Sequence, residues 1–392
     1  MTSTLTVTPE ECLLESRPPW IGDFFSEHTP LYIGGTDPGL DPDDEVAQLA
    51  ARGLNSKSRG AILLLGVVAN HQPAEDRAAL VRGTHFILNR AATPVVVGGE
   101  TPGHNDSVAT LPNYQFRCEY ATKDGLMHDT ATHMMHTCEM SMPGSLRMLG
   151  LSRFTDFAQF LAQHGKVAQR ALNRIVIMGG IEVENNALKL VDGLFVPDSA
   201  ANNKYDMEAA KRFYRLAQEL GIPLTVLTRH AAGVCQVPRW VYDELAERSP
   251  VGKRLQDIQR DSIEVLWRKA NMPPGVPERK GLPDRCDKAW FCKTFLGGQG
   301  DDRAGTDSIW DLVLGFNLYD PLTVLAAVDR VRQEFMDPYE IDIAAPFHAS
   351  GQATPVRHQI IGLSPQKTGI TNPREMVKFL IATMFAAIEP AA

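Results

Sequence analysis

Four aspartates lie within eight positions near the amino-terminal end of the chain, in the stretch Asp37-Pro38-Gly39-Leu40-Asp41-Pro42-Asp43-Asp44. One or two acidic residues commonly stabilise a helix N-terminus, but four like charges repel one another unless a cation lies among them. Because all their donor atoms are oxygens, the stretch predicts a site for a hard ion, Ca²⁺ or Mg²⁺, rather than for zinc. The alternative is an acidic helix cap without a metal.

The residues around this stretch predict how it is held. An apolar run, Leu31-Tyr32-Ile33, precedes it, and an apolar helical pattern beginning at Val46 follows it. This order indicates a strand, a tight turn at Pro38-Gly39, and a helix. We expect the helix to begin with Asp41 at its N-cap and Pro42 at its first position.

Strand and helix signals alternate along most of the chain. Strands are predicted near residues 31–33, 61–68, 94–99, 145–151, 174–180 and 223–227, and helices near 77–89, 154–163 and 207–220. This alternation predicts an α/β fold, with a mostly parallel, doubly wound (Rossmann-like) sheet flanked by helices. Ligands of such sheets bind at the carboxyl ends of the strands.

The amino-terminal residues and one internal stretch depart from this pattern. Residues 1–28 are expected to form a loosely ordered leader, because Pro18, Pro19 and Pro30 delay regular structure. Residues 29–392 are expected to form a single domain. Within it, residues 251–306 are rich in charge, proline and glycine, and we interpret them as a mainly helical cap or insertion near the site.

Composition excludes several classes of protein. The chain has 392 residues, of which 44% are hydrophobic and 22% charged, as in ordinary globular proteins. Its net charge of −8, without a Lys/Arg-rich run, argues against nucleic acid and anionic membranes as partners. No apolar stretch reaches the roughly 18 residues of a membrane span. Six cysteines without metal-like spacing, and no secretory signal, predict a cytoplasmic protein with reduced thiols.

Polar residues recur where the predicted strands end. Asn70 follows the strand at 61–68, Thr155 opens a helix, Asn202 precedes another, and Tyr319-Asp320 begins the last helical pattern. Each alone is more often a cap or a turn residue. Their repetition behind successive strands favours a functional site at one edge of the sheet.

In this order, the motifs resemble the inosine-uridine nucleoside hydrolase family. The matching segments are Asp37-Pro38-Gly39 with Asp43-Asp44, Val67–Asn70, Phe154–Ala158, Val176–Gly180, Pro197–Ala210 and Tyr319–Leu322. Together they cover roughly residues 31 to 330, and this collinear order is more specific than any single motif.

The resemblance implies an activity and a ligand set. It implies calcium-dependent hydrolysis of the N-glycosidic bond of a ribonucleoside or a related ribosylated compound, giving free base and ribose. The implied calcium ligands are Asp37, Asp44, Asp320 and the carbonyl of Thr155. Asp37 would be the general base, and Asp43, Asn70 and Asn202 would hold ribose hydroxyls. The implied partner is a small-molecule nucleoside or nucleotide, and a homo-oligomer is possible.

Departures from the family's pattern are equally informative. Gly35 replaces an aspartate, Ala200 replaces a sugar-binding glutamate, and Tyr319 replaces a histidine linked to protonation of the leaving group. The inserted Asp41-Pro42 leaves open whether Asp41 takes a role of Asp37 or Asp43. These differences resemble a branch that includes type III effectors of plant-pathogenic bacteria, as does the segment Lys280–Cys286.

The acid that activates the leaving group stays open at this point. Tyr319 can donate a hydrogen bond, stack on the base, or pack against the cap, and His71, His230 and His348 are rival acids. Two alternatives to a hydrolase also stay open. One is a ribose- or nucleotide-binding protein with weak or no activity, and the other is a phosphatase that uses the acidic stretch for Mg²⁺.

Overall fold

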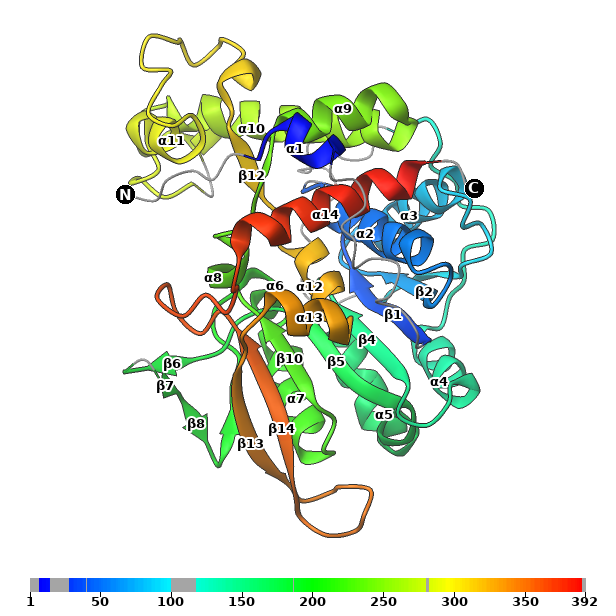
Figure 1. The fold of residues 1–392 in the computed structure, drawn as a ribbon. Coiled ribbons are helices and arrows are strands. Elements are labelled where there is room, and N and C mark those ends of the chain that lie inside the picture. Colours follow the sequence, from blue (N-terminus) through cyan, green and yellow to red (C-terminus); the bar gives the residue numbers. More distant parts are fainter. Residues whose placement is uncertain are drawn as a thin grey trace.

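The computed structural model describes residues 7–14, 28–39, 41–99, 118–185, 187–279 and 282–389 (Figure 1). Its strands are β1 (Thr29–Thr36), β2 (Ile62–Ala69), β3 (Val95–Val97), β4 (Leu146–Gly150), β5 (Leu172–Met178), β6 (Val183–Glu184), β7 (Ala187–Leu188), β8 (Leu190–Val191), β9 (Leu194–Phe195), β10 (Leu224–Leu227), β11 (Gln236–Pro238), β12 (Gly315–Asn317), β13 (Tyr339–Ala345) and β14 (Thr354–Ile361).

The helices alternate with these strands over the first two thirds of the chain. They are α1 (Pro9–Leu14), α2 (Asp43–Lys57), α3 (Ala74–Ile87), α4 (Thr130–Met140), α5 (Thr155–Ala171), α6 (Ala201–Lys204), α7 (Met207–Glu219), α8 (Arg229–Ala232), α9 (Trp240–Arg248), α10 (Pro250–Ala270), α11 (Lys288–Phe295), α12 (Asp320–Ala326), α13 (Asp329–Phe335) and α14 (Pro373–Ile388), with short 3₁₀ turns at Pro277–Arg279 and Trp310–Leu312.

An eight-stranded sheet forms the centre of the described part of the chain, in the order β13-β14-β10-β5-β4-β1-β2-β3. Every neighbouring pair is parallel except β13 and β14, which are antiparallel. The strand order reverses beside β1, since β2 lies on one side of β1 and β4 on the other. This is a doubly wound sheet, and its topological switch point lies between the carboxyl ends of β1 and β4. The predicted fold class is confirmed.

The apolar strands are buried on both faces, as their continuous apolar runs predicted. In β1, Leu31 and Ile33 pack into the core that includes α2, α12 and α14, whereas Tyr32 packs into the core that includes α4, α5 and α7. This alternation follows from the two-residue period of a strand. Helices therefore cover both faces of the sheet, and β1 is fixed between two cores.

Helix α2 carries two of the acidic residues, and its packing fixes their position. It lies between α12 and α14, and in Figure 1 the red helix α14 crosses in front of it. A Cβ atom at Gly53 would lie 1.9 Å from the carbonyl oxygen of Thr383, so only glycine permits this close approach of α2 and α14.

The structure describes part of the amino-terminal leader and most of the expected cap or insertion. Within residues 1–28, the described residues 7–14 include the helix α1, and Trp240 Nε1 donates a 2.9 Å hydrogen bond to the carbonyl of Val7. Most of the remaining leader lies outside the described residues. Residues 251–306 are mainly helical, as expected, and contain most of α10 and all of α11. In Figure 1 these helices lie together with α9 at one end of the molecule.

Candidate functional site

The acidic stretch follows β1 directly and leads into α2. Gly39 has φ of 146°, a value that favours glycine, and this residue allows the tight turn. The helix begins at Asp43 with Pro42 at the N-cap, and Pro42 itself supplies no side-chain cap. The expectation that Asp41 is the N-cap was therefore wrong by one residue. The carboxylates of the first turn are directed to other partners than the free N–H groups of the helix.

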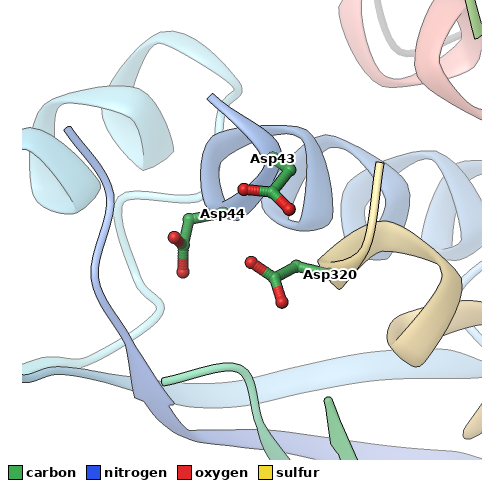
Figure 2. A group of neighbouring side chains, drawn as sticks. All are labelled: Asp43, Asp44 and Asp320. Carbon is green, nitrogen blue, oxygen red and sulfur yellow. The ribbon is translucent and has the colours of Figure 1, made fainter. Parts of the chain in front are cut away.

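Asp43 and Asp44, in the first turn of α2, meet Asp320, the first residue of α12. One carboxylate oxygen from each lies within 4.8 Å of the others, and all three side chains are buried. Figure 2 shows the three carboxylates pointing toward one another from the ends of the two helices. We call these residues the acidic triad. Within the described ranges, it is the one group of three such side chains close enough to share an ion.

Hydrogen bonds hold the triad in place. The hydroxyl of Thr36 and the backbone N–H of Asp37, at 2.9 Å, both donate to Oδ1 of Asp44. The backbone N–H of Tyr319 donates to Oδ2 of Asp43 at 3.2 Å. Burial, followed by the charge of neighbouring carboxyl groups, raises the pKa of Asp43, Asp44 and Asp320 well above the usual range.

These properties test whether a cation fits the triad. Burial and mutual repulsion both disfavour the charged form of the three carboxylates, and a divalent cation among them would offset both effects. The donor set consists only of carboxylate oxygens, which suits Ca²⁺ or Mg²⁺ and not zinc. The residues present therefore fit a hard cation.

Asp37 lies beside the triad but is not one of its members. Its half-buried carboxyl group lines the adjoining cavity, and burial raises its pKa to about 6 despite the opposing charge of Arg77. Asp41 is exposed and also lines the cavity. The structure thus places all four predicted aspartates of the loop at one cavity. The three carboxylates that lie close together include that of Asp43 and not that of Asp37.

The predicted amide and hydroxyl residues are engaged in bonds with the protein. Asn202 lines the cavity, and its amide nitrogen donates to the carbonyls of Leu151 at 2.8 Å and Met178 at 3.0 Å. Asn70 is fully buried and is not part of the cavity lining. Its amide nitrogen donates to Oδ2 of Asp156 at 2.9 Å and to the carbonyl of Arg153 at 3.2 Å.

Thr155 also lies outside the cavity lining, and its hydroxyl donates to Oδ2 of Asp206 at 2.8 Å. The roles of Thr155 as a calcium ligand and of Asn70 as a ribose ligand stay predictions. Both residues do lie at the expected edge of the sheet, because Asn70 follows β2 and Thr155 begins the helix after β4.

The cavity has a volume of about 690 Å³ and opens at the carboxyl ends of the parallel strands. Its lining residues are the four loop aspartates, Leu151, Met178, Gly179, residues 181–183 and 198–202, Tyr205, residues 228–230, Tyr319, Asp320 and residues 362–365. Arg229 is the one lysine or arginine in this lining. The cavity therefore has a strongly acidic wall, opposed in its lining by the guanidinium group of Arg229 and the imidazole of His230.

Several of these lining residues were not identified from the sequence. Tyr205 stacks on His71, with ring centroids 4.4 Å apart, and residues 362–365 follow the carboxyl end of β14. The position of Tyr205 three residues after Asn202 was the available signal for that residue. No described residue of the stretch 251–306 lines the cavity, and Lys280 and Gly281 lie outside the described residues.

No described helix is both long enough and apolar enough to cross a membrane. No family model and no curated protein matches the sequence.

Solved structures do match the fold. The type III effector XopQ, in a crystal structure with adenosine diphosphate ribose, is 31% identical to this chain, with a TM-score of 0.75 over 98% of this chain and 100% of that one. The effector XOO4466 is 29% identical, with a TM-score of 0.72 over 97% of both chains. A purine-preferring ribonucleoside hydrolase from Gardnerella vaginalis has a TM-score of 0.56 at 16% identity, over 92% of this chain and 99% of that one.

The doubly wound sheet has the nucleoside-hydrolase-like α/β fold, and the acidic cavity lies at its switch point. At 31% identity over almost the full length of both chains, the protein belongs to the nucleoside-hydrolase-like family, in the branch of XopQ-type effectors.

Proposed function

We propose that this protein hydrolyses the N-glycosidic bond of a ribosylated compound with the help of calcium. The observation that carries the proposal is the acidic triad, which lies beside Asp37 in a cavity at the switch point of the sheet. Asp43, Asp44 and Asp320, together with Asp37, would hold the ion. When bound, calcium would orient ribose hydroxyls and lower the pKa of a water molecule.

The residues of the chain supply the remaining steps. Asp37 accepts the proton of the attacking water, whose oxygen bonds to the anomeric carbon. The carbon–nitrogen bond breaks, and its electron pair leaves with the base. Asp43 and Asn202 restrict the sugar to one orientation, which lowers the entropic part of the barrier. Tyr319 is the lining residue adjacent to the triad that can donate a hydrogen bond to the departing base.

We also propose that the ligand carries phosphate. Arg229 places one guanidinium group in a cavity otherwise rich in carboxylates, and guanidinium groups bind phosphate in a bidentate manner. The relative XopQ has been crystallised with adenosine diphosphate ribose. A ribosylated nucleotide would place its sugar at the acidic triad and its phosphate at Arg229.

A second candidate function is binding without turnover. Ala200 stands where the resemblance expects a sugar-binding glutamate, and Tyr319 stands where it expects a histidine. Both replacements remove groups that assist the reaction, while the triad and the cavity persist. The protein would then sequester a ribosylated ligand.

One experiment separates these candidates. Adenosine, AMP and ADP-ribose are each incubated with the calcium-loaded protein, and binding is measured by calorimetry and base release by chromatography. Turnover of any member supports the hydrolase, and binding without base or ribose release supports the second candidate. Arg229→Gln should weaken binding of AMP and ADP-ribose at least tenfold and leave that of adenosine unchanged. Absence of both binding and turnover for all three contradicts the proposal.

A further inference from the structure

The side chain of Arg77, in α3, binds the backbone of the acidic loop. Its side chain is buried, and Nη1 donates to the carbonyl oxygens of Asp37 at 2.6 Å and Pro38 at 2.7 Å. Nη2 and Nε donate to the carbonyl of Gln72 at 3.2 and 3.4 Å. One guanidinium group thus joins the loop after β1 to the loop after β2.

The backbone N–H of the same residue, Asp37, is held by α2. The N–H of Asp37 donates to Oδ1 of Asp44 at 2.9 Å, and the hydroxyl of Thr36 donates to the same oxygen. The backbone N–H of Asp37 is therefore fixed by one helix and its carbonyl by another. Because the backbone is held on both sides of Cα, the direction in which the Asp37 side chain leaves the backbone is fixed.

The shape of the guanidinium group suits this arrangement. It is planar, with five N–H donors in fixed directions, so it binds three carbonyl oxygens of two loops at once. A lysine ammonium at this position has the charge but lacks the fixed fork. Arg77 also places a positive charge behind a loop that carries four aspartates, which reduces their mutual repulsion.

We propose that Arg77 is a positioning residue for the cation site: it fixes the backbone of Asp37 and Pro38, and calcium affinity depends on this. The inference rests on the proposed function, because it assumes that the acidic loop holds calcium. It goes further in assigning a role to a residue outside the cavity lining, which contacts neither ion nor substrate.

The chain contains a matched control for this residue. Arg279 is equally buried, at 3% exposure for both side chains. Among the described residues its hydrogen-bond acceptors are backbone carbonyls, those of Lys269, Ala270, Met272, Pro283, Asp284 and Cys286. None of these residues lines the cavity. Loss of either arginine leaves buried carbonyls unsatisfied, but only Arg77 holds the acidic loop.

The test compares Arg77→Met, Arg77→Lys and Arg279→Met in the full chain. Calcium affinity is measured by calorimetry well below each melting temperature, and the melting temperature without calcium reports the fold. We expect both methionine variants to lower the melting temperature. Arg77→Met should weaken calcium binding at least tenfold, Arg77→Lys should weaken it less, and Arg279→Met should leave it within twofold of wild type.

Equal calcium affinity in wild type and in both Arg77 variants would overturn the inference, as would an equal loss in Arg279→Met. If Arg77→Met does not fold, Arg77→Lys decides by the same criterion. A wild-type protein that binds calcium and ligand, with unaffected Arg77 variants, refutes only the role of Arg77. A wild-type protein that binds no calcium refutes the proposed function and the inference together.

Discussion

The backbone N–H of Tyr319 donates a 3.2 Å hydrogen bond to Oδ2 of Asp43, across 276 positions of sequence. This bond joins the amino-terminal ends of α2 and α12, so that Asp320 comes to lie beside Asp43 and Asp44. The acidic triad is therefore built from two segments that are distant along the chain, and the like charges of its members oppose the folded state when no cation is present.

Replacing Asp320 by asparagine should separate two effects on the stability of the fold, the loss caused by charge repulsion and the gain caused by calcium binding. Asp320→Asn removes one buried charge, so the melting temperature in chelator should equal or exceed that of wild type. Excess calcium should raise the melting temperature of wild type, by linkage to binding, but not that of the variant. Thermal denaturation with chelator and with calcium measures both effects.

Asp329→Asn is the matched control for this change. Asp329 is an α13 aspartate whose exposed fraction is 40%, and it pairs with Arg147 and Arg332. Its replacement should lower the melting temperature slightly and preserve the full response to calcium. A full calcium response in Asp320→Asn would show that the ion does not bind at the triad.

Replacement of Asp37 should mainly reduce kcat, and replacement of Asp44 should mainly reduce calcium affinity. Asp44 is a member of the acidic triad, whereas Asp37 lines the cavity beside it. Asp37→Asn should lower kcat by about 10²–10⁴-fold, the range for loss of a general base, and reduce calcium affinity less than Asp44→Asn does. Steady-state kinetics and calorimetry check this, and turnover retained in Asp37→Asn would exclude Asp37 as the base.

Asn202 should be important for stability as well as for ligand binding. Its amide nitrogen donates to carbonyls at the ends of β4 and β5, so Asn202→Asp places a carboxylate against two carbonyl oxygens. We expect a loss of about 2–4 kcal/mol in the free energy of unfolding, measured in urea. The control Asn317→Asp, at an exposed position of β12, should change it by less than about 0.5 kcal/mol. Equal effects of the two changes would contradict this account.

Tyr319 should limit the activation of poor leaving groups. An imidazolium, with an ordinary pKa of about 6.5, is a stronger acid than a phenol, whose ordinary pKa is about 10. Tyr319→His should therefore increase turnover of substrates with basic leaving groups, by on the order of 10²-fold. The gain should decline as the pH rises above about 6.5, because the imidazole loses its proton.

Tyr319→Phe keeps the ring and removes the hydroxyl. If the hydroxyl donates to the base, this change should lower kcat about tenfold, the value of one hydrogen bond. Kinetics from pH 5 to 9 on both variants test the assignment. Wild-type rates in Tyr319→Phe would show that the ring only packs.

His358 should make the fold sensitive to acid. It is fully buried in β14, its Nδ1 accepts a 3.0 Å hydrogen bond from the N–H of Leu224, and burial lowers its pKa to about 4. The unfolded chain, with an ordinary pKa of 6.5, binds the proton first as the pH falls. The stability that neutral His358 supplies is complete above pH 6.5 and is lost between 6.5 and about 4, by up to about 3 kcal/mol.

His358→Asn provides the comparison, since an amide oxygen can accept the same bond and does not titrate. The difference in unfolding free energy between wild type and variant should change over this pH range and be constant above it. A difference that is flat from pH 4 to 8 would refute the assignment to His358.

How much of this could be predicted from sequence depends on how local each signal is. The acidic loop, the strands β1 to β5 and Asp320 follow from apolar runs and motif spacing, and the structure places them as expected. The start of α2 was misplaced by one residue, because Pro42 is accepted both at the N-cap and at the first helical position. The orientation of Asn70 depends on Asp156, 86 positions away, and no local pattern reports it.

The wall formed by residues 362–365 could not be predicted for a similar reason. It depends on β14 pairing with β10 and β13, and buried and exposed residues alternate along much of β14, so it lacks the continuous apolar run of a central strand. Its place in the sheet is set by pairing with strands that lie elsewhere in the sequence.

The position of β14 also bears on the order in which the molecule is made. A long interval separates synthesis of the acidic loop from synthesis of residues 362–365, which follow β14. At ordinary elongation rates this interval is on the order of 20–60 seconds. Throughout it, the four aspartates lack the far wall of their cavity and lack α14 over α2, so the cavity is complete only after β14 and α14 have been made.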